Sequence, residues 1–236
     1  EMQRSLVGSE MCIRDSYYSM SVWGGEWTCG IGCAVSDRPE RPFKDCGMMF
    51  RSNGIKVQNS IDPFYIEDNG HKYLFWGSFR GIYAIELSED GLSLKSGSSP
   101  VQIAGTAYEG TYIHKRGGYY YMFASIGSCC EGLKSTYTTV VGRSTSLFGP
   151  YLDKKGQSMM DNHHEILIHK NDSFVGTGHN SEIVSDNAGT DWLFYHAVSV
   201  ANPDGRVLML DKIDWIDGWP SVEGNSPSVK SEKPRF

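Results

Sequence analysis

The feature that most constrains the fold of this chain is an internal repeat. Residues 61–78 and 108–125 align without a gap at an offset of 47 residues. The alignment pairs aromatic and hydroxyl side chains, namely Tyr65 with Tyr112, Tyr73 with Tyr120 and Ser78 with Ser125. A repeat of this length that is built from short aromatic strands is typical of the blades of a β-propeller.

Each copy of the repeat carries an acidic residue at its leading end, Asp62 in the first copy and Glu109 in the second. Because equivalent positions of successive blades face a common axis, we expect these two carboxylates to lie close together. A pair of carboxyl groups is what acid and base catalysis needs. Each acid also has a simpler interpretation: Asp62 precedes Pro63 as in many turns, and Glu109 fits a solvated strand end.

The rest of the chain continues the pattern of paired strands. A third hairpin is predicted over residues 182–195, and outer strands are predicted at 42–47, 82–87, 149–156 and 207–211. No amphipathic helix of convincing length is evident. The pattern predicts an all-β fold with one incomplete blade, residues 17–58, and three fuller ones, 59–106, 107–177 and 178–224. We expect residues 17–236 to form a single, incomplete propeller domain.

The first sixteen residues do not fit this pattern. They show no strand alternation, and they lack the apolar region of a signal peptide. The run Met11-Cys-Ile-Arg-Asp15-Ser16 is typical of a translated adapter from DNA library preparation. We therefore expect residues 1–16 to be a non-native artefact, so that the natural sequence enters part-way through a blade at Tyr17. A natural N-terminal segment is the alternative.

Composition excludes several classes of partner. The chain has 236 residues, a net charge of −6 and a pI of about 5.6. This balance argues against nucleic acid or an anionic membrane surface and suits a neutral, soluble substrate. No apolar run approaches the roughly 20 residues of a membrane span. We expect a monomer.

The cysteine spacing argues against a zinc site. The six cysteines include no two C-x₂-C pairs, and Cys129 and Cys130 are adjacent, which is poor geometry for a disulfide with each other. We expect packed thiols. A disulfide between loops is the alternative for an exported protein.

Several residues near the two acids are candidates for sugar binding. Trp76, Phe79, Tyr108 and Tyr112 would stack on the apolar face of a sugar, or would pack in the core. Ser78 and Ser125 are matched polar residues that would line a cleft. His179 occupies roughly the same position before the third hairpin as the two acids before theirs. It is either a metal or water ligand or a structural histidine.

An ordered set of motifs resembles glycoside hydrolase family 43, and within it the endo-1,5-α-L-arabinanases. The resemblance covers the chain from Tyr17 to the C-terminus. The motifs are Asn59-Ser-Ile-Asp62-Pro, Trp76-Gly-Ser78-Phe-Arg-Gly-Ile82, Tyr108-Glu109-Gly, Cys129-Cys-Glu-Gly-Leu-Lys-Ser135-Thr-Tyr137, Val141-Gly-Arg-Ser144, Gly149-Pro-Tyr-Leu-Asp153 and Gly178-His179-Asn180-Ser181.

The resemblance implies a five-bladed β-propeller whose first blade is missing here. It implies that Glu109 is the general acid and that Asp62 tunes the proton affinity of this acid and orients the sugar. Glu109 is followed by Gly-Thr where the family usually has Ala-Pro or similar. His179 matches a histidine that many arabinanases place beside a calcium ion, often through water. The base Asp of the family has no counterpart in this chain, and no organic cofactor is implied.

The implied reaction is inverting hydrolysis of internal α-1,5-L-arabinofuranosidic links in arabinan. Since loss of a general base typically costs about 10²–10⁴ in rate, we expect the chain by itself to be inactive or nearly so. Two alternatives remain open: an exo-acting α-L-arabinofuranosidase or β-xylosidase of the same fold, and a non-catalytic propeller that binds carbohydrate. An enzyme acting on this polymer is expected to be secreted or periplasmic.

Overall fold

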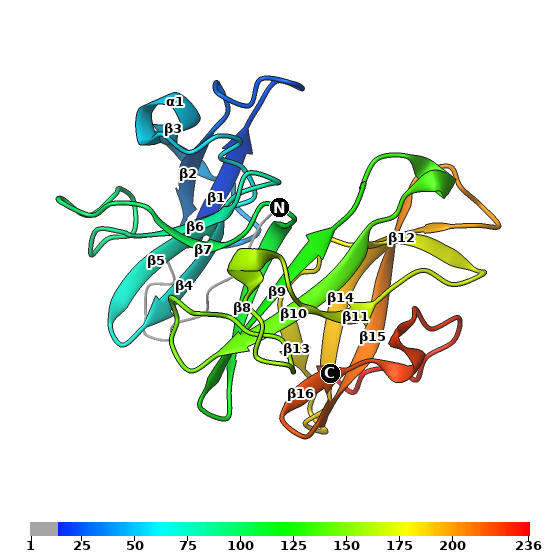
Figure 1. Cartoon of the computed structure of the whole chain (residues 1–236). Coiled ribbons are helices and arrows are strands. Elements are labelled where there is room, and N and C mark those ends of the chain that lie inside the picture. The colour runs from blue at the N-terminus through cyan, green and yellow to red at the C-terminus, as the bar shows by residue number, and fades with distance from the viewer. Residues whose placement is uncertain (1–13) are drawn as a thin grey trace. The chain divides into compact units, whose positions relative to one another are not determined.

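The computed structural model of the chain describes residues 14–236, which form two compact units. The first unit ends at Thr111 and the second begins at Tyr112. Figure 1 shows that antiparallel strands make up nearly all the regular structure of both units. Each unit is described by itself below.

The first unit contains two antiparallel sheets and one short helix. The first sheet has the order β1-β2-β3 and the second the order β4-β5-β6-β7. The strands are β1 (Arg14–Met20), β2 (Gly30–Ser36), β3 (Lys44–Arg51), β4 (Phe64–Asp68), β5 (His71–Trp76), β6 (Ile82–Glu86) and β7 (Val101–Ala104), and the helix is α1 (Ser52–Ile55). Within each sheet every strand pairs with the next one in the chain, which is the meander of a propeller blade.

Aromatic side chains pack the two sheets of the first unit together. Tyr17 of β1 stacks on Tyr65 of β4 with ring centroids 5.5 Å apart, and Phe50 of β3 lies 5.0 Å from Trp76 of β5. Both contacts belong to one buried cluster that also includes Leu74 and other apolar residues. Large buried rings contribute strongly to the free energy of unfolding because each removes about 150–250 Å² from water. This core fixes the strand ends that carry the candidate site.

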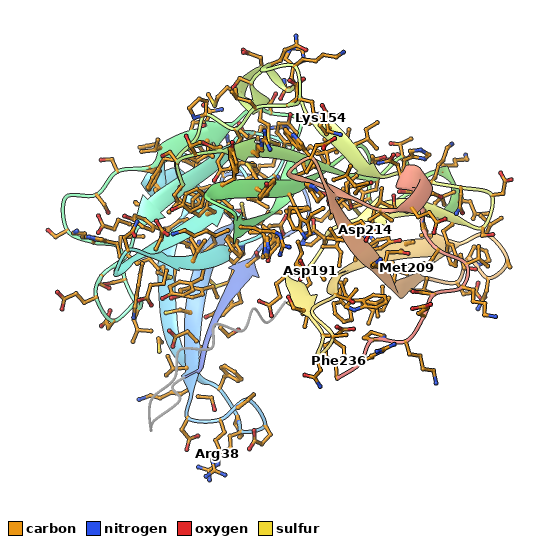
Figure 2. All side chains as sticks on the ribbon, turned by 90° about the horizontal axis from the view of Figure 1, so that it is seen from below. Arg38, Lys154, Asp191, Met209, Asp214 and Phe236 are labelled. Atoms are coloured by element: carbon orange, nitrogen blue, oxygen red, sulfur yellow. A yellow bond between two sulfur atoms is a disulfide. The ribbon has the colours of Figure 1, made fainter. Side chains whose placement is uncertain are left out.

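The second unit also contains two antiparallel sheets. The orders are β8-β9-β10-β11 and β12-β14-β15-β16, and β13 also pairs with β14. Its strands are β8 (Glu109–Arg116, which starts before the boundary), β9 (Tyr119–Ile126), β10 (Thr138–Ser144), β11 (Glu165–Ile168), β12 (Phe174–Gly178), β13 (Ile183–Ser185), β14 (Asp191–Ser199), β15 (Arg206–Ile216) and β16 (Trp219–Ser221). Short 3-10 helices cover Gly132–Lys134, Met159–Asp161 and Glu223–Asn225. Figure 2 labels Asp191 on β14 and Asp214 on β15, the strands that form the longest pairing of this unit.

The structure confirms the prediction of an all-β fold built from repeated hairpins. Tyr65 and Tyr112 lie on β4 and β8, and Tyr73 and Tyr120 lie on the strands that follow, β5 and β9. Over the described residues the helices are only three or four residues long. None of them is long and apolar enough to cross a membrane. The total of five blades and the missing first blade stay predictions.

Two details of the predicted strands were wrong. The segment 149–156 is not an outer strand, because only Leu152 forms bridges there, to Arg143 and to Ser158. Pro150 has no N–H to offer a ladder, and β11 takes the outer position instead. The boundary at 177–178 was also misplaced: β12 pairs with β14, so it belongs to the last sheet of the chain.

The N-terminal segment falls partly outside the described residues. Residues 1–13 of the predicted artefact lie there, whereas Arg14–Ser16 continue β1, with Asp15 opposite Val35. Backbone pairing does not report the origin of a segment, so the assignment of residues 1–16 as foreign stays a prediction. The same holds for the prediction of a single domain over residues 17–236.

The cysteines behave partly as expected. Cys29 and Cys33 are buried free thiols, as predicted for packed side chains, and Cys46 is free and exposed. Cys129 and Cys130, in contrast, form a disulfide with each other, so the prediction that adjacency disfavours this pairing was wrong. The loop between β9 and β10 accommodates the bond.

Candidate functional site

The candidate site is built around Glu109, the first residue of β8. Its side chain is 7% exposed, and its Oε2 accepts a hydrogen bond of 2.8 Å from the hydroxyl of Ser78, which is 2% exposed. The backbones of the two residues also form an antiparallel bridge. The N–H of Phe79 donates to the carbonyl oxygen of Tyr108 at 2.8 Å. The segment after β5 therefore holds the start of β8 through both backbone and side chain.

The segment that carries Asp62 is joined to the same place. The carbonyl oxygen of Ile61 accepts from the N–H of Gly77 at 3.0 Å, and Nδ2 of Asn59 donates to the carbonyl oxygen of Ser78 at 2.8 Å. Residues 59–62 and the start of β8 are thus bound to the same short segment, 77–79. This arrangement is what the repeat predicts for the two backbones, and the meeting of the two carboxylates stays a prediction.

A serine hydroxyl contacts the leading residue of each predicted hairpin. Ser19 Oγ accepts from the N–H of Asp62 at 2.9 Å, and Ser125 Oγ accepts from the N–H of His179 at 2.7 Å. Ser78 contacts Glu109 through its side chain instead. Ser78 and Ser125 are the matched serines of the repeat, and each contacts the leading residue of the next hairpin, Ser78 by donating to a side chain and Ser125 by accepting from a backbone N–H. In the Glu109 case the serine hydroxyl binds the carboxyl group itself.

Left-handed backbone conformations gather at this site. Asn59, Asp62 and Phe79 have φ values of 55°, 58° and 52°. Such values are uncommon outside glycine, although Asn and Asp tolerate them best, and for a bulky residue like Phe79 they are strained. Strained residues persist where their surroundings fix them, and they cluster at active sites. The strain at Phe79, directly after Ser78, indicates a segment held in one shape.

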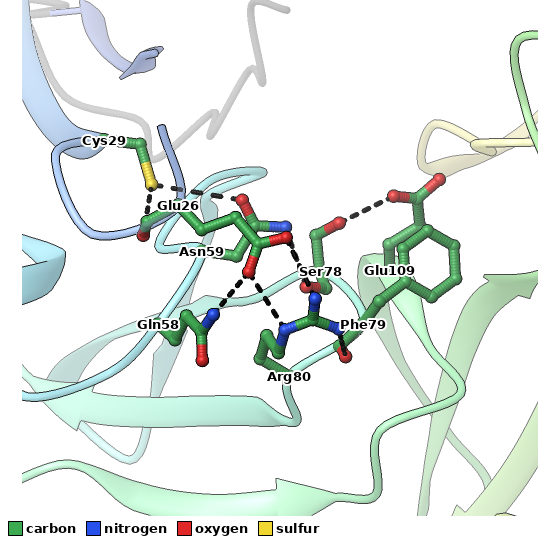
Figure 3. A network of polar contacts seen from close by, with 8 residues as sticks. All are labelled: Glu26, Cys29, Gln58, Asn59, Ser78, Phe79, Arg80 and Glu109. Atoms are coloured by element: carbon green, nitrogen blue, oxygen red, sulfur yellow. Dashed lines mark hydrogen bonds and ion pairs between the residues drawn. The ribbon is translucent and has the colours of Figure 1, made fainter. Parts of the chain in front are cut away.

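The carboxylate of Glu26 binds the side chain of Arg80 and so holds the segment that follows Ser78 (Figure 3). Its Oε1 and Oε2 accept from Nη2 and Nε of Arg80 at 2.9 and 3.0 Å, and Oε2 also accepts from Nε2 of Gln58 at 2.5 Å. Nη1 of Arg80 donates to the carbonyl oxygen of Phe79 at 2.8 Å. A bidentate pair of this kind holds its partners in one orientation. The network therefore clamps residues 79–80 beside the Ser78–Glu109 hydrogen bond.

This clamp was missed in the sequence. Arg80 lies in one of the motifs that carry the family resemblance, but Glu26 sits in the glycine-containing loop between β1 and β2. The two are 54 residues apart, and no repeat links them. The sequence shows only that Glu26 and Arg80 carry opposite charges, and many other pairs of residues in the chain do so too.

The aromatic residues that were predicted to stack on a sugar differ in their exposure to solvent. Trp76 and Tyr108 are fully buried, at 0% exposure, and Nε1 of Trp76 donates to Ser60 Oγ at 3.0 Å. Both rings are buried, which is the core-packing role that the sequence left open for them. Phe79 is partly exposed. Trp23, which the sequence analysis did not single out, is 91% exposed on the loop that carries Glu26.

His179 belongs to the second unit. Its φ of 49° matches that of Asp62, as its position before the third hairpin predicts. Its ring stacks at 6.4 Å from that of His196. Among residues 14–236 no group of three or more His, Cys, Asp or Glu side chains is placed to hold a metal. A calcium ion beside His179, held directly or through water, therefore stays a prediction.

Comparison with known proteins gives one family. Residues 13–220 match the glycosyl hydrolases family 43. The chain is 37% identical over 214 residues to an extracellular endo-α-(1→5)-L-arabinanase of Bacillus subtilis, covering 87% of this chain and 64% of that protein. It is 35% identical over 233 residues to an extracellular exo-α-(1→5)-L-arabinofuranosidase of Cellvibrio japonicus, covering 88% and 65%. The chain thus spans slightly less than two thirds of the length of these relatives.

The fold is also that of a solved relative. An α-L-arabinanase of Cellvibrio cellulosa, complexed with arabinohexaose, superposes with a TM-score of 0.82 at 33% identity. The superposition covers 90% of this chain and 74% of the relative. The family match over residues 13–220 includes the β4–β5 and β8–β9 hairpins that build the candidate site.

Proposed function

Because this chain belongs to glycosyl hydrolases family 43, we propose that the protein hydrolyses internal α-1,5-L-arabinofuranosidic links of arabinan with inversion. The observation that carries the proposal is the buried Glu109 carboxyl, whose Oε2 is held by the Ser78 hydroxyl. A general acid must deliver its proton to the leaving oxygen from a fixed position, and a carboxyl group held in one orientation by a hydrogen bond is suited to that role. Both named relatives act on α-(1→5)-linked arabinose.

In the proposed step Glu109 protonates the glycosidic oxygen. Since Oε2 accepts from Ser78, we assign the proton to Oε1. As the bond between the anomeric carbon and the glycosidic oxygen breaks, the proton passes from Oε1 to that oxygen, and Glu109 becomes a carboxylate. The Ser78 hydrogen bond is stronger to a carboxylate than to a neutral carboxyl group. Ser78 therefore stabilises the charge that develops on the acid during the step.

Asp62 is the second carboxyl group of the proposal. Its segment is bound to residue 77, and a negative charge near the acid favours the protonated form of that acid. In an inverting reaction a base activates water on the other face of the sugar, and the two carboxyl groups stand roughly 6.5–9.5 Å apart. We assign no described residue to the base.

The Glu26–Arg80 clamp is proposed to position the acid. By fixing the carbonyl of Phe79, Arg80 fixes the residue that follows Ser78. A positioned hydrogen bond is worth more than a mobile one because a misplacement of about 1 Å can cost 10²-fold in rate. Trp23, which is 91% exposed on the loop that carries Glu26, is proposed to offer an aromatic face to a neutral sugar.

An exo-acting enzyme is the second candidate, because one relative of similar identity carries that name. Endo and exo action differ in their products. We also propose that the protein is exported, since both relatives are named extracellular.

The test uses linear α-1,5-arabinan and arabinohexaose, with the Glu109→Gln variant as control. Products are separated by anion-exchange chromatography over a long incubation. We expect slow release of oligosaccharides of several lengths, absent from the variant. Release of arabinose or of one short product alone would identify exo action. The proposed function would be overturned if the protein bound neither substrate and cleaved neither of them.

A further inference from the structure

A pocket in the second unit is lined by residues that take no part in the site described above. Its volume is about 350 Å³, and its walls include Tyr119 of β9, Arg143 of β10, Leu152 and Lys154 of the following loop, and Trp219 of β16. A smaller pocket of about 340 Å³ also contains Lys154 and Trp219. Volumes near 300 Å³ are at the lower end of ligand sites and suit a single small molecule.

Arg143 is held rigidly in the wall of this pocket. Its guanidinium carbon lies 4.3 Å from the ring centroid of Tyr119 and 4.6 Å from that of Trp219. Its Nη1 donates to the carbonyl oxygen of Gly218 at 2.9 Å. Stacking uses the flat faces of a guanidinium group, whereas hydrogen bonds leave from its edge. The contacts therefore fix Arg143 and still leave N–H groups without an acceptor among the described residues.

Lys154 brings a second positive charge to the same ring. Its Nζ lies 5.7 Å from the centroid of Trp219. Neither Lys154 nor Arg143 forms an ion pair with a carboxylate of residues 14–236. The positive charges of Arg143 and Lys154 repel each other across the ring of Trp219. This cationic pair stands out in a protein whose net charge is −6. An anion bound between the two side chains would offset this repulsion and accept hydrogen bonds from the remaining N–H groups of Arg143.

The carboxylate in the pocket wall does not fill that role. Asp153 Oδ1 accepts from the backbone N–H groups of Lys155 and Gln157, both at 2.8 Å. Its side chain shapes the turn that presents Lys154. Glu165 Oε1 accepts from the backbone N–H of Lys154 at 2.9 Å. Neither of these two carboxylates forms an ion pair with the side chain of Arg143 or Lys154, so both cations remain available to a ligand.

We propose that this pocket binds the carboxylate of a uronate sugar. The edge of Arg143 matches a carboxylate in a two-point hydrogen bond, and Lys154 adds a point charge. The apolar side of Leu152 and the ring of Tyr119 suit the C–H face of a sugar ring and favour it over inorganic phosphate. A neutral arabinose unit would not use the two charges, so the ligand differs from the proposed substrate.

The test is a titration of the ¹⁵N-labelled chain by NMR at constant ionic strength. The probes are D-galacturonate, its neutral methyl ester and inorganic phosphate. We expect saturable shifts of the Trp219 indole N–H and of the amides of residues 153–156 with galacturonate, and affinity at least about tenfold weaker for the ester and for phosphate. Equal affinity for the ester, tighter binding of phosphate, or no saturable shift would overturn the proposal.

Matched variants locate the effect. Lys154→Gln is expected to weaken galacturonate binding by about three- to tenfold, and Arg143→Lys by a similar factor because it keeps the charge and loses the two-point geometry. Lys155→Gln is the control, since Lys155 is the exposed neighbour and does not line the pocket. If Lys154→Gln and Lys155→Gln weakened galacturonate binding equally, the effect would come from the overall charge of the loop and not from the pocket, and the assignment would be overturned. Lys154 is exposed, so its replacement tests the proposal without risk to the fold.

Discussion

Ser78 donates a hydrogen bond of 2.8 Å to Oε2 of Glu109, and both residues are almost fully buried. The two come from successive hairpins of the repeat, and their backbones are bridged as well. One oxygen of the carboxyl group thereby accepts a hydrogen bond from Ser78, and in the proposed step the proton leaves from the other oxygen. The proposed chemistry depends on this asymmetry.

The first prediction concerns the hydroxyl of Ser78. Ser78→Ala removes a hydrogen bond that strengthens as Glu109 loses its proton, so kcat on arabinohexaose should fall by about tenfold with little change in KM. Steady-state kinetics check this result, with Ser125→Ala as the matched control from the other copy of the repeat. A rise in KM with unchanged kcat would assign Ser78 to substrate binding instead.

The second prediction concerns Asp62. Asp62→Asn keeps a residue that tolerates the φ of 58°, so the fold should be retained, as thermal unfolding would show. We expect kcat to fall and the alkaline limb of the pH–rate profile to move to lower pH, because a negative charge that favours the protonated acid is lost. An unshifted profile would leave Asp62 as a turn residue only.

The third prediction concerns the clamp. Glu26 and Arg80 are about one third and two fifths exposed, at 32% and 43% of their side chains, so breaking the pair should cost less than about 1 kcal/mol of stability. Glu26→Gln should nevertheless lower kcat several-fold, because the carbonyl of Phe79 loses its fixed partner. Asp37→Asn, which breaks the exposed pair with Arg41, is the control. Equal effects of the two variants on kcat would contradict a positioning role.

The fourth prediction concerns stability in acid. Burial opposes ionisation of Asp186, but the N–H groups of Arg235, Thr190 and Ala188 and the indole of Trp192 donate to it and lower its pKa to about 2. A carboxylate with a lowered pKa stabilises the fold above its unfolded value near 4, and this contribution is lost as pH falls toward 2. Asp186→Asn should therefore melt below the wild type at pH 7, with the difference closing between about pH 4 and pH 2. Calorimetry across this range checks it, and a constant difference would contradict it.

Sequence reasoning reached the fold because the repeat fixes strand spacing locally. Tyr65 and Tyr112 occupy equivalent strands because both lie at the same distance from the same kind of turn. The segment 149–156 was misassigned because glycine and proline mark the start of a loop as often as that of a strand. Similarly, β12 was placed in the wrong sheet because partner choice is a long-range property that periodicity does not report.

The site was predictable only where the repeat touched it. Glu109 and Ser78 stood out as repeated positions, whereas Glu26 became visible only through its distance to Arg80. Burial separated Trp76 from a sugar-binding role, and the sequence offered no measure of burial for one tryptophan among six.

The central claim is that Glu109 is the proton donor. Its most direct test is how the loss of rate caused by Glu109→Gln depends on the leaving group of the substrate. A general acid is needed for a poor leaving group such as a sugar hydroxyl and much less for an activated nitrophenolate. Rates are compared for arabinohexaose and for a 2-chloro-4-nitrophenyl arabino-oligosaccharide. We predict a loss of about 10²–10⁴ on the first substrate and a far smaller loss on the second. Equal losses on both substrates, or none on either, would contradict the assignment of Glu109 as proton donor.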